Sequence, residues 1–172
     1  HALDDRWARL LVADAGVGRG DLVLDIGAGH GAITRALVEA GARVVAIETH
    51  PGRLAHLRAQ FGRDVRVVRA DATDLRLPRH AYHVVANPPF AITSALLTRL
   101  LQRGSRLASA HIVLQDGAAR RWVRPDAPGA RRWQHEFAAE LGRPVPNGAF
   151  RPRPRVGGRV LVLRNLSAGA GR

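Results

Sequence analysis

Apolar residues follow two different spacings between residues 3 and 114 of the chain. Apolar positions repeated every three or four residues predict amphipathic helices, and short continuous apolar runs predict buried strands. The runs predict five strands, at residues 21–26, 43–47, 65–68, 82–86 and 107–114. The helical spacing predicts an opening helix that carries Leu3, Trp7, Leu10 and Leu11 on one face, and further helices after the first, second and fourth strands. Strands that alternate with helices indicate an α/β fold with a mostly parallel sheet covered on both faces.

The pattern changes from residue 116 onwards. Residues 116–132 combine several arginines with two prolines, so we expect a mobile basic loop there. Two last strands are predicted at residues 133–141 and 158–163, with a proline-rich stretch at 143–155 between them. The elements predict a single domain over residues 1–166 and a disordered tail at 167–172.

Charge adds a polyanionic partner to this picture. The 172 residues carry a net charge of +13, and all 27 basic residues are arginine. Such an excess points most simply to nucleic acid, and a generally basic, solvated surface is the alternative. The absence of cysteine excludes disulfides and thiolate catalysis, and the scattered histidines predict no metal site. No apolar run approaches the ~20 residues that a membrane span needs, so we expect a cytoplasmic protein.

A glycine-rich segment, Asp25-Ile-Gly-Ala-Gly-His-Gly31, separates the first predicted strand from the helix that follows it. Glycines let the backbone approach a ligand closely, and a helix N-terminus offers free N–H groups. The segment also satisfies the G-x-G-x-x-G/A pattern of dinucleotide-binding folds. By itself it therefore favours a nucleotide-like ligand without naming one.

Two acidic residues follow the next two predicted strands. Glu48 ends the second strand, where a carboxylate can accept both ribose hydroxyls of a nucleoside cofactor. Asp71 follows the third strand, where a carboxylate can accept a hydrogen bond from an adenine amino group. A dehydrogenase would also place an acidic residue at Glu48, and either residue could instead be a solvated loop carboxylate.

The tetrapeptide Asn87-Pro-Pro-Phe90 directly follows the fourth predicted strand. Two prolines fix the backbone, so the Asn87 side-chain oxygen and the Pro88 carbonyl become rigid acceptors. Two acceptors that match the two N–H groups of a planar exocyclic amine favour a more tetrahedral nitrogen, whose lone pair is then free to attack a sulfonium methyl. Phe90 offers an aromatic face for a base. The tetrapeptide therefore predicts methylation of an amine by positioning, without a strong general base.

Together these motifs resemble the ordered motifs of class I amino-methyltransferases that use S-adenosylmethionine. The segment Gly148-Ala-Phe-Arg-Pro-Arg-Pro-Arg-Val156 is similar to the F-x-P-x-P-x-V segment of the rRNA adenine N6-methyltransferases, which comprise erythromycin-resistance enzymes and small-subunit rRNA dimethyladenosine transferases. The resemblance covers about residues 3–164. It implies a Rossmann-like domain with a seven-stranded, mostly parallel sheet whose last strand is antiparallel.

The resemblance also implies a role for each motif. The residues implied to bind S-adenosylmethionine are Asp25, Gly27, Ala28, Gly29, Glu48, Thr49, Asp71, Ala72 and Asn87. The residues implied to act on the target amine are Asn87, Pro88 and Phe90. Phe90 and Phe150 would stack on the flipped base. With the basic charge, the substrate-binding set is completed by Arg120, Arg121, Arg124 and Arg153.

Three departures from the family pattern stand out. Pro88 replaces the usual aliphatic residue, and DNA adenine and protein glutamine methyltransferases also carry N-P-P-[YF]. The family's upstream Q-N-F-L-like element is not visible, and His1-Ala-Leu3 is the one candidate for a remnant of it. The family's small helical C-terminal domain is absent from the 172 residues.

The sequence therefore predicts a monomeric enzyme that methylates an adenine N6 in protein-free or partly assembled large-subunit rRNA, as macrolide-resistance enzymes do. The enzyme alternatives are a small-subunit rRNA, DNA adenine or protein glutamine methyltransferase. The non-enzyme alternative is an RNA-binding module that keeps the fold without catalysis.

Overall fold

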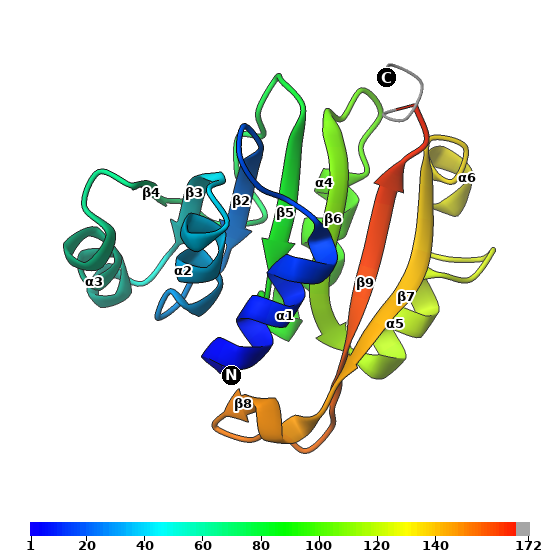
Figure 1. Ribbon diagram of the computed structural model, residues 1–172. Helices are drawn as coiled ribbons and strands as arrows, with labels where there is room; N and C mark the ends of the chain where they lie inside the picture. The colour runs from blue at the N-terminus through cyan, green and yellow to red at the C-terminus, as the bar shows by residue number, and fades with distance from the viewer. Residues whose placement is uncertain (168–172) are drawn as a thin grey trace.

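The computed structural model describes residues 1–167 and contains a seven-stranded sheet with helices on both faces (Figure 1). From edge to edge, the strands are β4 (Val65–Arg69), β3 (Arg43–Glu48), β2 (Leu22–Ile26), β5 (Tyr82–Ala86), β6 (Leu107–Gln115), β9 (Gly158–Asn165) and β7 (Phe137–Val145). A second, two-stranded sheet pairs β1 (Ala2–Leu3) with β8 (Phe150–Arg151). Except for Ser167, the expected tail at 167–172 falls outside the described residues.

The sheet has the predicted mixture of directions. Strands β4, β3, β2, β5 and β6 are mutually parallel, and β9, the last strand of the chain, runs antiparallel to both β6 and β7. The register aligns Ala110 with Leu163 across β6 and β9. The predicted Rossmann-like fold class, with an antiparallel last strand, is confirmed. The insertion of β9 between β6 and β7 was not predicted.

Helices cover the two faces in separate groups. One face carries α1 (Asp5–Ala15), α2 (Ala32–Glu39) and α3 (Pro51–Phe61). The other face carries α4 (Thr93–Leu100), α5 (Asp116–Trp122) and α6 (Ala130–Trp133). Neighbouring strand residues point to opposite faces, so Val84 packs with the second group and Val85 with the first. The parallel strands therefore carry apolar residues that face both helix groups, as a sheet covered on both faces requires.

Local signals explain most of the helix ends. Asp4 caps α1 by accepting a 2.9 Å hydrogen bond from the Trp7 backbone N–H, and Gly16 ends the helix in the left-handed conformation. Pro51 opens α3, as predicted. Leu3 lies in β1 and not in the opening helix, because its backbone pairs with Phe150 of β8.

The segment after β6 corrects the predicted mobile loop. Residues 116–132 contain α5 and begin α6, and the Trp122 and Trp133 rings are buried side by side with their centroids 6.3 Å apart. Trp133 also donates its indole N–H to the Pro128 carbonyl at 2.9 Å. Burial of two large rings orders this segment. Trp133 therefore belongs to a helix, and the strand expected at 133–141 begins at Phe137.

The strand order reverses between β2 and β5, which are neighbours in the sheet although β3 and β4 separate them in the chain. In open parallel sheets, ligands bind outside the carboxyl ends of the strands at such a reversal. The glycine loop and the Asn87 tetrapeptide each follow one of these two strands. Among residues 1–167, no helix is long and apolar enough to cross a membrane.

Candidate active site

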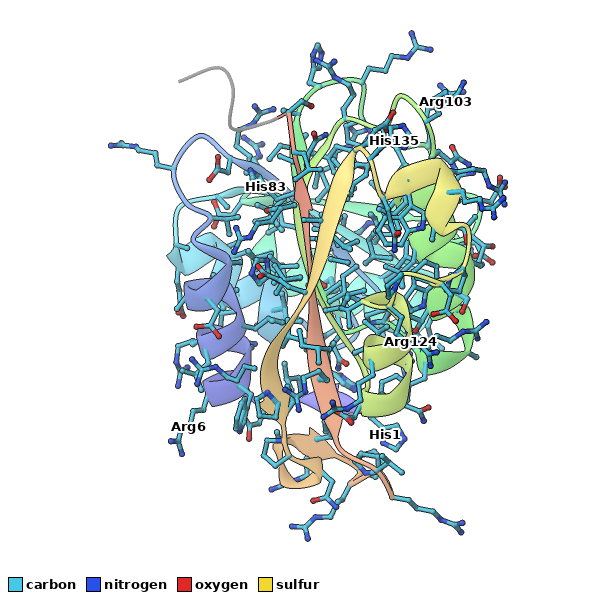
Figure 2. All side chains as sticks on the ribbon, turned by 90° about the vertical axis from the view of Figure 1, so that its right-hand side faces the viewer. His1, Arg6, His83, Arg103, Arg124 and His135 are labelled. Atoms are coloured by element: carbon cyan, nitrogen blue, oxygen red, sulfur yellow. The ribbon has the colours of Figure 1, made fainter. Side chains whose placement is uncertain are left out.

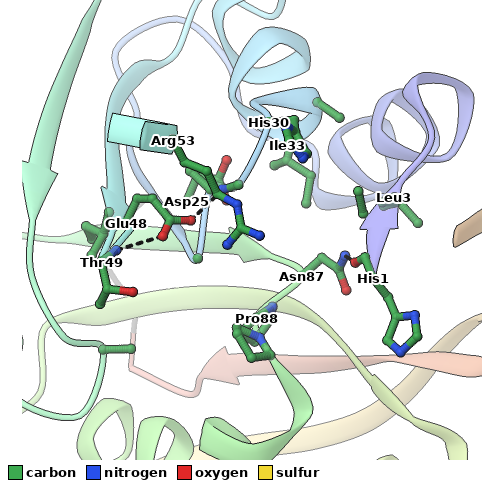
Figure 3. A pocket seen from close by; sticks show the side chains of 18 of the residues that line it. His1, Leu3, Asp25, His30, Ile33, Glu48, Thr49, Arg53, Asn87 and Pro88 are labelled. Atoms are coloured by element: carbon green, nitrogen blue, oxygen red, sulfur yellow. Dashed lines mark hydrogen bonds between the residues drawn. The ribbon is translucent and has the colours of Figure 1, made fainter. Parts of the chain in front are cut away.

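A cavity of about 430 Å³ opens at the carboxyl ends of β2, β3 and β5 (Figure 3). The predicted motifs all contribute to its wall. Their lining residues are Asp25, Gly27, Ala28, Gly29, Glu48, Thr49, Asp71, Ala72, Asn87, Pro88, Pro89 and Phe90. The fold therefore brings together segments that lie more than 60 residues apart in the chain.

Gly27 packs directly against the Asn87 tetrapeptide. A Cβ atom at Gly27 would lie 3.3 Å from the Pro88 Cα and 3.2 Å from the Pro89 Cδ, and its φ of 76° is in the left-handed region. Only glycine meets both conditions without strain. The backbone N–H groups of Gly27 and Ala28 both donate to the Ile47 carbonyl, at 2.9 and 3.0 Å. These contacts lock the glycine loop to the end of β3 and to the Asn87 turn.

Glu48 is almost completely buried and organises the loop around it. Its Oε1 accepts from the Gly29 backbone N–H at 2.9 Å, and its Oε2 accepts from the N–H groups of Thr49 and His50, each at 2.8 Å. A carboxylate oxygen has two acceptor positions. Oε1 therefore retains capacity for a ligand hydroxyl, while Oε2 is filled by the protein. One acceptor position on Oε1 is thus available to a ribose hydroxyl, and the expected contact with both hydroxyls stays a prediction.

Asp25 lies beneath the glycine loop and is shielded from solvent. The Thr34 hydroxyl donates to its Oδ2 at 2.6 Å. Burial raises the pKa of Asp25 to about 7, against the lowering effect of the Thr34 hydrogen bonds and with a smaller upward contribution from the Glu48 charge. A positive ligand near this carboxyl would favour its ionised form.

Asp71 is exposed at the other end of the cavity. Its Oδ1 accepts from the Thr73 hydroxyl at 2.7 Å and from the Thr73 backbone N–H at 2.8 Å. These hydrogen bonds lower the pKa of Asp71, with the side-chain bond as the larger cause. Because both bonds fall on Oδ1, the second oxygen remains for an adenine amino group.

The Asn87 side chain is oriented by the start of the chain. Its Nδ2 donates to the His1 backbone carbonyl at 3.0 Å (Figure 3). A carbonyl only accepts, so the amide must turn its NH₂ toward His1 and its Oδ1 the other way. The His1 carbonyl therefore positions the acceptor that the sequence assigned to the target amine.

His1 also meets the aromatic residue of the tetrapeptide. The His1 and Phe90 rings are stacked at 6.2 Å with an interplanar angle of 29°. The His1 Nδ1 lies 2.7 Å from the Pro152 carbonyl, to which it donates. Pairing of β1 with β8 holds His1 in this place. Phe90 thus has an aromatic neighbour at the mouth of the cavity, although that neighbour is not Phe150.

The expected role of Phe150 in base stacking is corrected by its burial. Its side chain is 0% exposed and packs in the core with α1 and α2. A Cβ atom at Gly158 would lie 3.2 Å from the Phe150 ring, so β9 closes over it. A ring in this position cannot contact a base. The residues of the same segment that do line the cavity are Arg151 and Pro152.

The predicted substrate-binding arginines do not line the cavity. Arg120 forms an ion pair with Asp116 at 2.7 Å, and Arg124 forms one with Asp126 at 3.0 Å. Arg121 and Arg153 also lie outside the cavity wall. Their expected contact with RNA stays a prediction about the outer surface.

Several lining residues were missed by sequence reasoning, among them His30 and Arg53. Arg53 occupies the first turn of α3, five residues after Glu48, and its side chain points toward the cavity (Figure 3). That position after the strand-end glutamate was the available signal. Arg151 reaches the cavity because β8 pairs with β1.

The family model for ribosomal RNA adenine dimethylases matches residues 7–167. The chain belongs to this family. Among its relatives, the mycinamicin-resistance protein MyrB of Micromonospora griseorubida is 39% identical over 85% of the chain and 47% of its own length. Ribosomal RNA small subunit methyltransferase A of Anaeromyxobacter sp. (strain K) is 34% identical over 94% of the chain and 62% of its own length.

The solved structure of the 23S rRNA methyltransferase ErmE superposes with a TM-score of 0.86 at 26% identity, over 96% of the chain and 70% of that protein. The chain thus spans about half to two thirds of the curated dimethylase relatives named here. The predicted family is confirmed, and a dehydrogenase is set aside.

Dimethylases of this fold imply S-adenosylmethionine, and the cavity fits it. Its volume is within the usual range for small-molecule sites. Gly27 and Gly29 leave bare backbone at the wall, and the acceptors of Glu48 and Asp71 match a ribose and an adenine amine. Among residues 1–167, no group of three or more potential ligands could hold a metal ion.

Proposed function

We propose that the chain methylates the N6 amine of an adenine in ribosomal RNA, with S-adenosylmethionine as the methyl donor. The observation that carries the proposal is the contact between Gly27 and the Asn87 tetrapeptide. That contact places a cofactor-type glycine loop directly against two rigid acceptors for an amine. Family membership supports adenine in RNA as the target.

The chain's own residues would act by positioning. When bound, S-adenosylmethionine supplies a methyl group carried on a positively charged sulfur. Asn87 Oδ1 and the Pro88 carbonyl would accept the two N–H groups of the adenine amine and favour a nitrogen with a free lone pair. The His1 carbonyl keeps the Asn87 amide in the required orientation. Positioning of this kind needs no strong base.

Phe90 would supply the contact to the base itself. Its ring lies at the cavity wall beside Pro88, with His1 stacked on it. An adenine must leave its stack before its amine can react, at a cost of a few kcal/mol, and an aromatic contact can offset part of that cost. The proposed active form is a monomer.

We further propose that the target lies in large-subunit rRNA and that methylation confers macrolide-type resistance. The names of MyrB and ErmE support this choice. A small-subunit target is the second candidate, because relatives named as small-subunit methyltransferases are 32–36% identical to the chain.

Tritiated-methyl transfer tests the proposal. Protein-free large-subunit rRNA, small-subunit rRNA, duplex DNA and a release-factor-like protein would be offered separately, and the labelled position mapped. We expect label on one adenine of large-subunit rRNA. Label confined to small-subunit rRNA would favour the second candidate. Label only on DNA or protein would refute rRNA methylation, and failure to bind S-adenosylmethionine in calorimetry would favour an inactive RNA-binding module.

A further inference from the structure

A second hollow, of about 340 Å³, lies at the amino ends of β5 and β6, whereas the cofactor cavity lies at the carboxyl ends of the strands. It is formed by the turn before β5 and by the end of α4 with the turn that follows. Its lining residues are Leu77, Pro78, Arg79, Arg99, Gln102, Arg103, Gly104, Ser105 and Arg106. We call it the arginine hollow. Figure 2 shows Arg103 at one end of the molecule and His1, which lines the cofactor cavity, at the other.

The arginine hollow gathers positive charge that the chain leaves unneutralised. Four of its nine lining residues are arginines and none is acidic. None of these four arginines forms an ion pair with any residue between 1 and 167. Elsewhere in that range, ion pairs occupy Arg35, Arg120, Arg124, Arg143, Arg159 and Arg164. Twenty of the 26 arginines in residues 1–167 lack an ion-pair partner, so the hollow is distinguished by the gathering of four of them on one concave surface without an acidic residue.

Arg99 differs from the other three arginines of the hollow because the backbone of the chain holds it. It reaches back from α4 to donate through Nη2 to the Leu75 carbonyl. Its Nε is buried and has no acceptor in the described part of the chain. A buried donor on a charged group is costly when it is left unsatisfied.

Phosphate is the anion that suits this set of donors. Guanidinium groups form paired hydrogen bonds with phosphate oxygens, and several arginines can neutralise successive phosphates. The Ser105 and Gln102 side chains add neutral donors to the wall. The hollow is also open to the surface, so a chain of phosphates can pass across it.

The distance to the cofactor cavity determines what could reach both sites. Strand β6 runs from the level of the hollow to the level of the cofactor cavity. It has nine residues, which corresponds to about 30 Å at ~3.3 Å per residue. We propose that Arg79, Arg99, Arg103 and Arg106 bind backbone phosphates of the RNA substrate about 30 Å from the methylated base. This inference rests on the proposed function, because it takes RNA as the substrate.

The test compares two triple variants on two RNAs. Arg79→Gln/Arg103→Gln/Arg106→Gln removes three arginines of the hollow. It keeps Arg99, because this residue donates a hydrogen bond to the Leu75 carbonyl. The control, Arg35→Gln/Arg143→Gln/Arg164→Gln, removes the same charge from three ion-paired arginines. One RNA is a short hairpin that carries the target adenine. The other extends the same stem by more than 30 Å.

The readout is the salt dependence of RNA affinity. Each phosphate contact contributes about 0.7–0.9 to the slope of log affinity against log salt concentration. The slope of the hollow variant on the long RNA should therefore be smaller by about 2–3. Its slope on the hairpin should match that of the unchanged protein. The control variant should show the smaller loss on both RNAs. Unaltered melting temperature and S-adenosylmethionine affinity check that the variants are folded.

Two results would overturn the inference. An unchanged slope on the long RNA would mean that the hollow does not bind RNA phosphates, and an acidic protein segment would become the alternative ligand. An equal loss on the hairpin, or an equal loss in the control variant, would mean that the arginines act only through net charge. Methylation of the hairpin by the unchanged protein reports on the proposed function separately. If the hairpin is not methylated while the long-RNA effect persists, the proposed function fails and the phosphate site stands.

Discussion

In the main sheet, the surfaces at the carboxyl ends and at the amino ends of the parallel strands differ in their chemistry. We call them the carboxyl edge and the amino edge. At the carboxyl edge, Glu48, Asp71 and Asn87 present acceptors that are oriented by hydrogen bonds within the chain. At the amino edge, the arginine hollow presents donors without ion-pair partners among residues 1–167. Oriented acceptors suit a small cofactor and one base, because binding of these ligands depends on the positions of individual donor groups. Unpaired guanidinium groups suit a long polyanion, whose charge matters more than its register.

The largest expected effect separates the two phenylalanines near the carboxyl edge. Phe150→Ala should cost about 3–5 kcal/mol of folding free energy, because it leaves a cavity in a closed core. Phe90→Ala should instead lower kcat/KM, with a loss of transition-state stabilisation of about 1–3 kcal/mol, because one base contact is lost. The stability of the protein should change little. Chemical denaturation and methyl-transfer kinetics measure both. A Phe150→Ala protein of normal stability would restore the base-stacking role for this residue.

The next largest effect concerns the acceptor for the amine. Asn87→Ala should lower kcat by about 100- to 1000-fold, by analogy with the loss of one preorganised hydrogen-bonding group in an active site. Titration calorimetry should find a smaller loss of S-adenosylmethionine affinity, because Asn87 also lines the cofactor cavity while its main proposed role is toward the substrate amine. Single-turnover rates on rRNA provide the measurement. A variant that keeps more than a tenth of the normal rate would refute the role assigned to Asn87.

Glu48 should affect the cofactor alone. Glu48→Ala should weaken S-adenosylmethionine binding by about 1–3 kcal/mol, since it removes a charged hydrogen-bond partner and frees the Gly29 loop. RNA affinity at low cofactor concentration should remain normal, because this carboxylate lies far from the arginine hollow. Calorimetry with the cofactor and filter binding with RNA separate the two. Equal weakening of both ligands would argue against independent edges.

The smallest effect compares one glycine from each edge. Gly27 and Gly104 both have left-handed φ values, of 76° and 80°, but only a Cβ at Gly27 would meet neighbouring atoms within 4 Å. Gly104→Ala should cost about 1–2 kcal/mol of stability from backbone strain alone. Gly27→Ala should cost about 1 kcal/mol more and weaken cofactor binding, since the new methyl presses on Pro88 and Pro89. Identical losses in thermal melts and in calorimetry would contradict a tight contact at Gly27.

Much of the cofactor site was predictable, because its residues follow strands that are continuous apolar runs. The chain returns to the same edge after every parallel strand, so the segments after β2, β3, β4 and β5 had to meet. Gly27, Glu48, Asp71 and Asn87 were identified in this way, and the cavity contains all four. The fold class followed from the same alternation.

The sequence by itself thus determined the elements whose signals are local: apolar runs, helix caps, glycines in turns and the rigid Asn87 tetrapeptide. Tertiary structure decided the insertion of β9 between β6 and β7, the pairing of β1 with β8 and the burial of Phe150. It also decided which arginines reach a cavity and which are neutralised by Asp or Glu. An apolar or charged residue has the same local pattern whether it faces core, ligand or solvent. Its partner is set by contacts across as many as 151 residues, as between His1 and Pro152, and these depend on the packing of the whole chain.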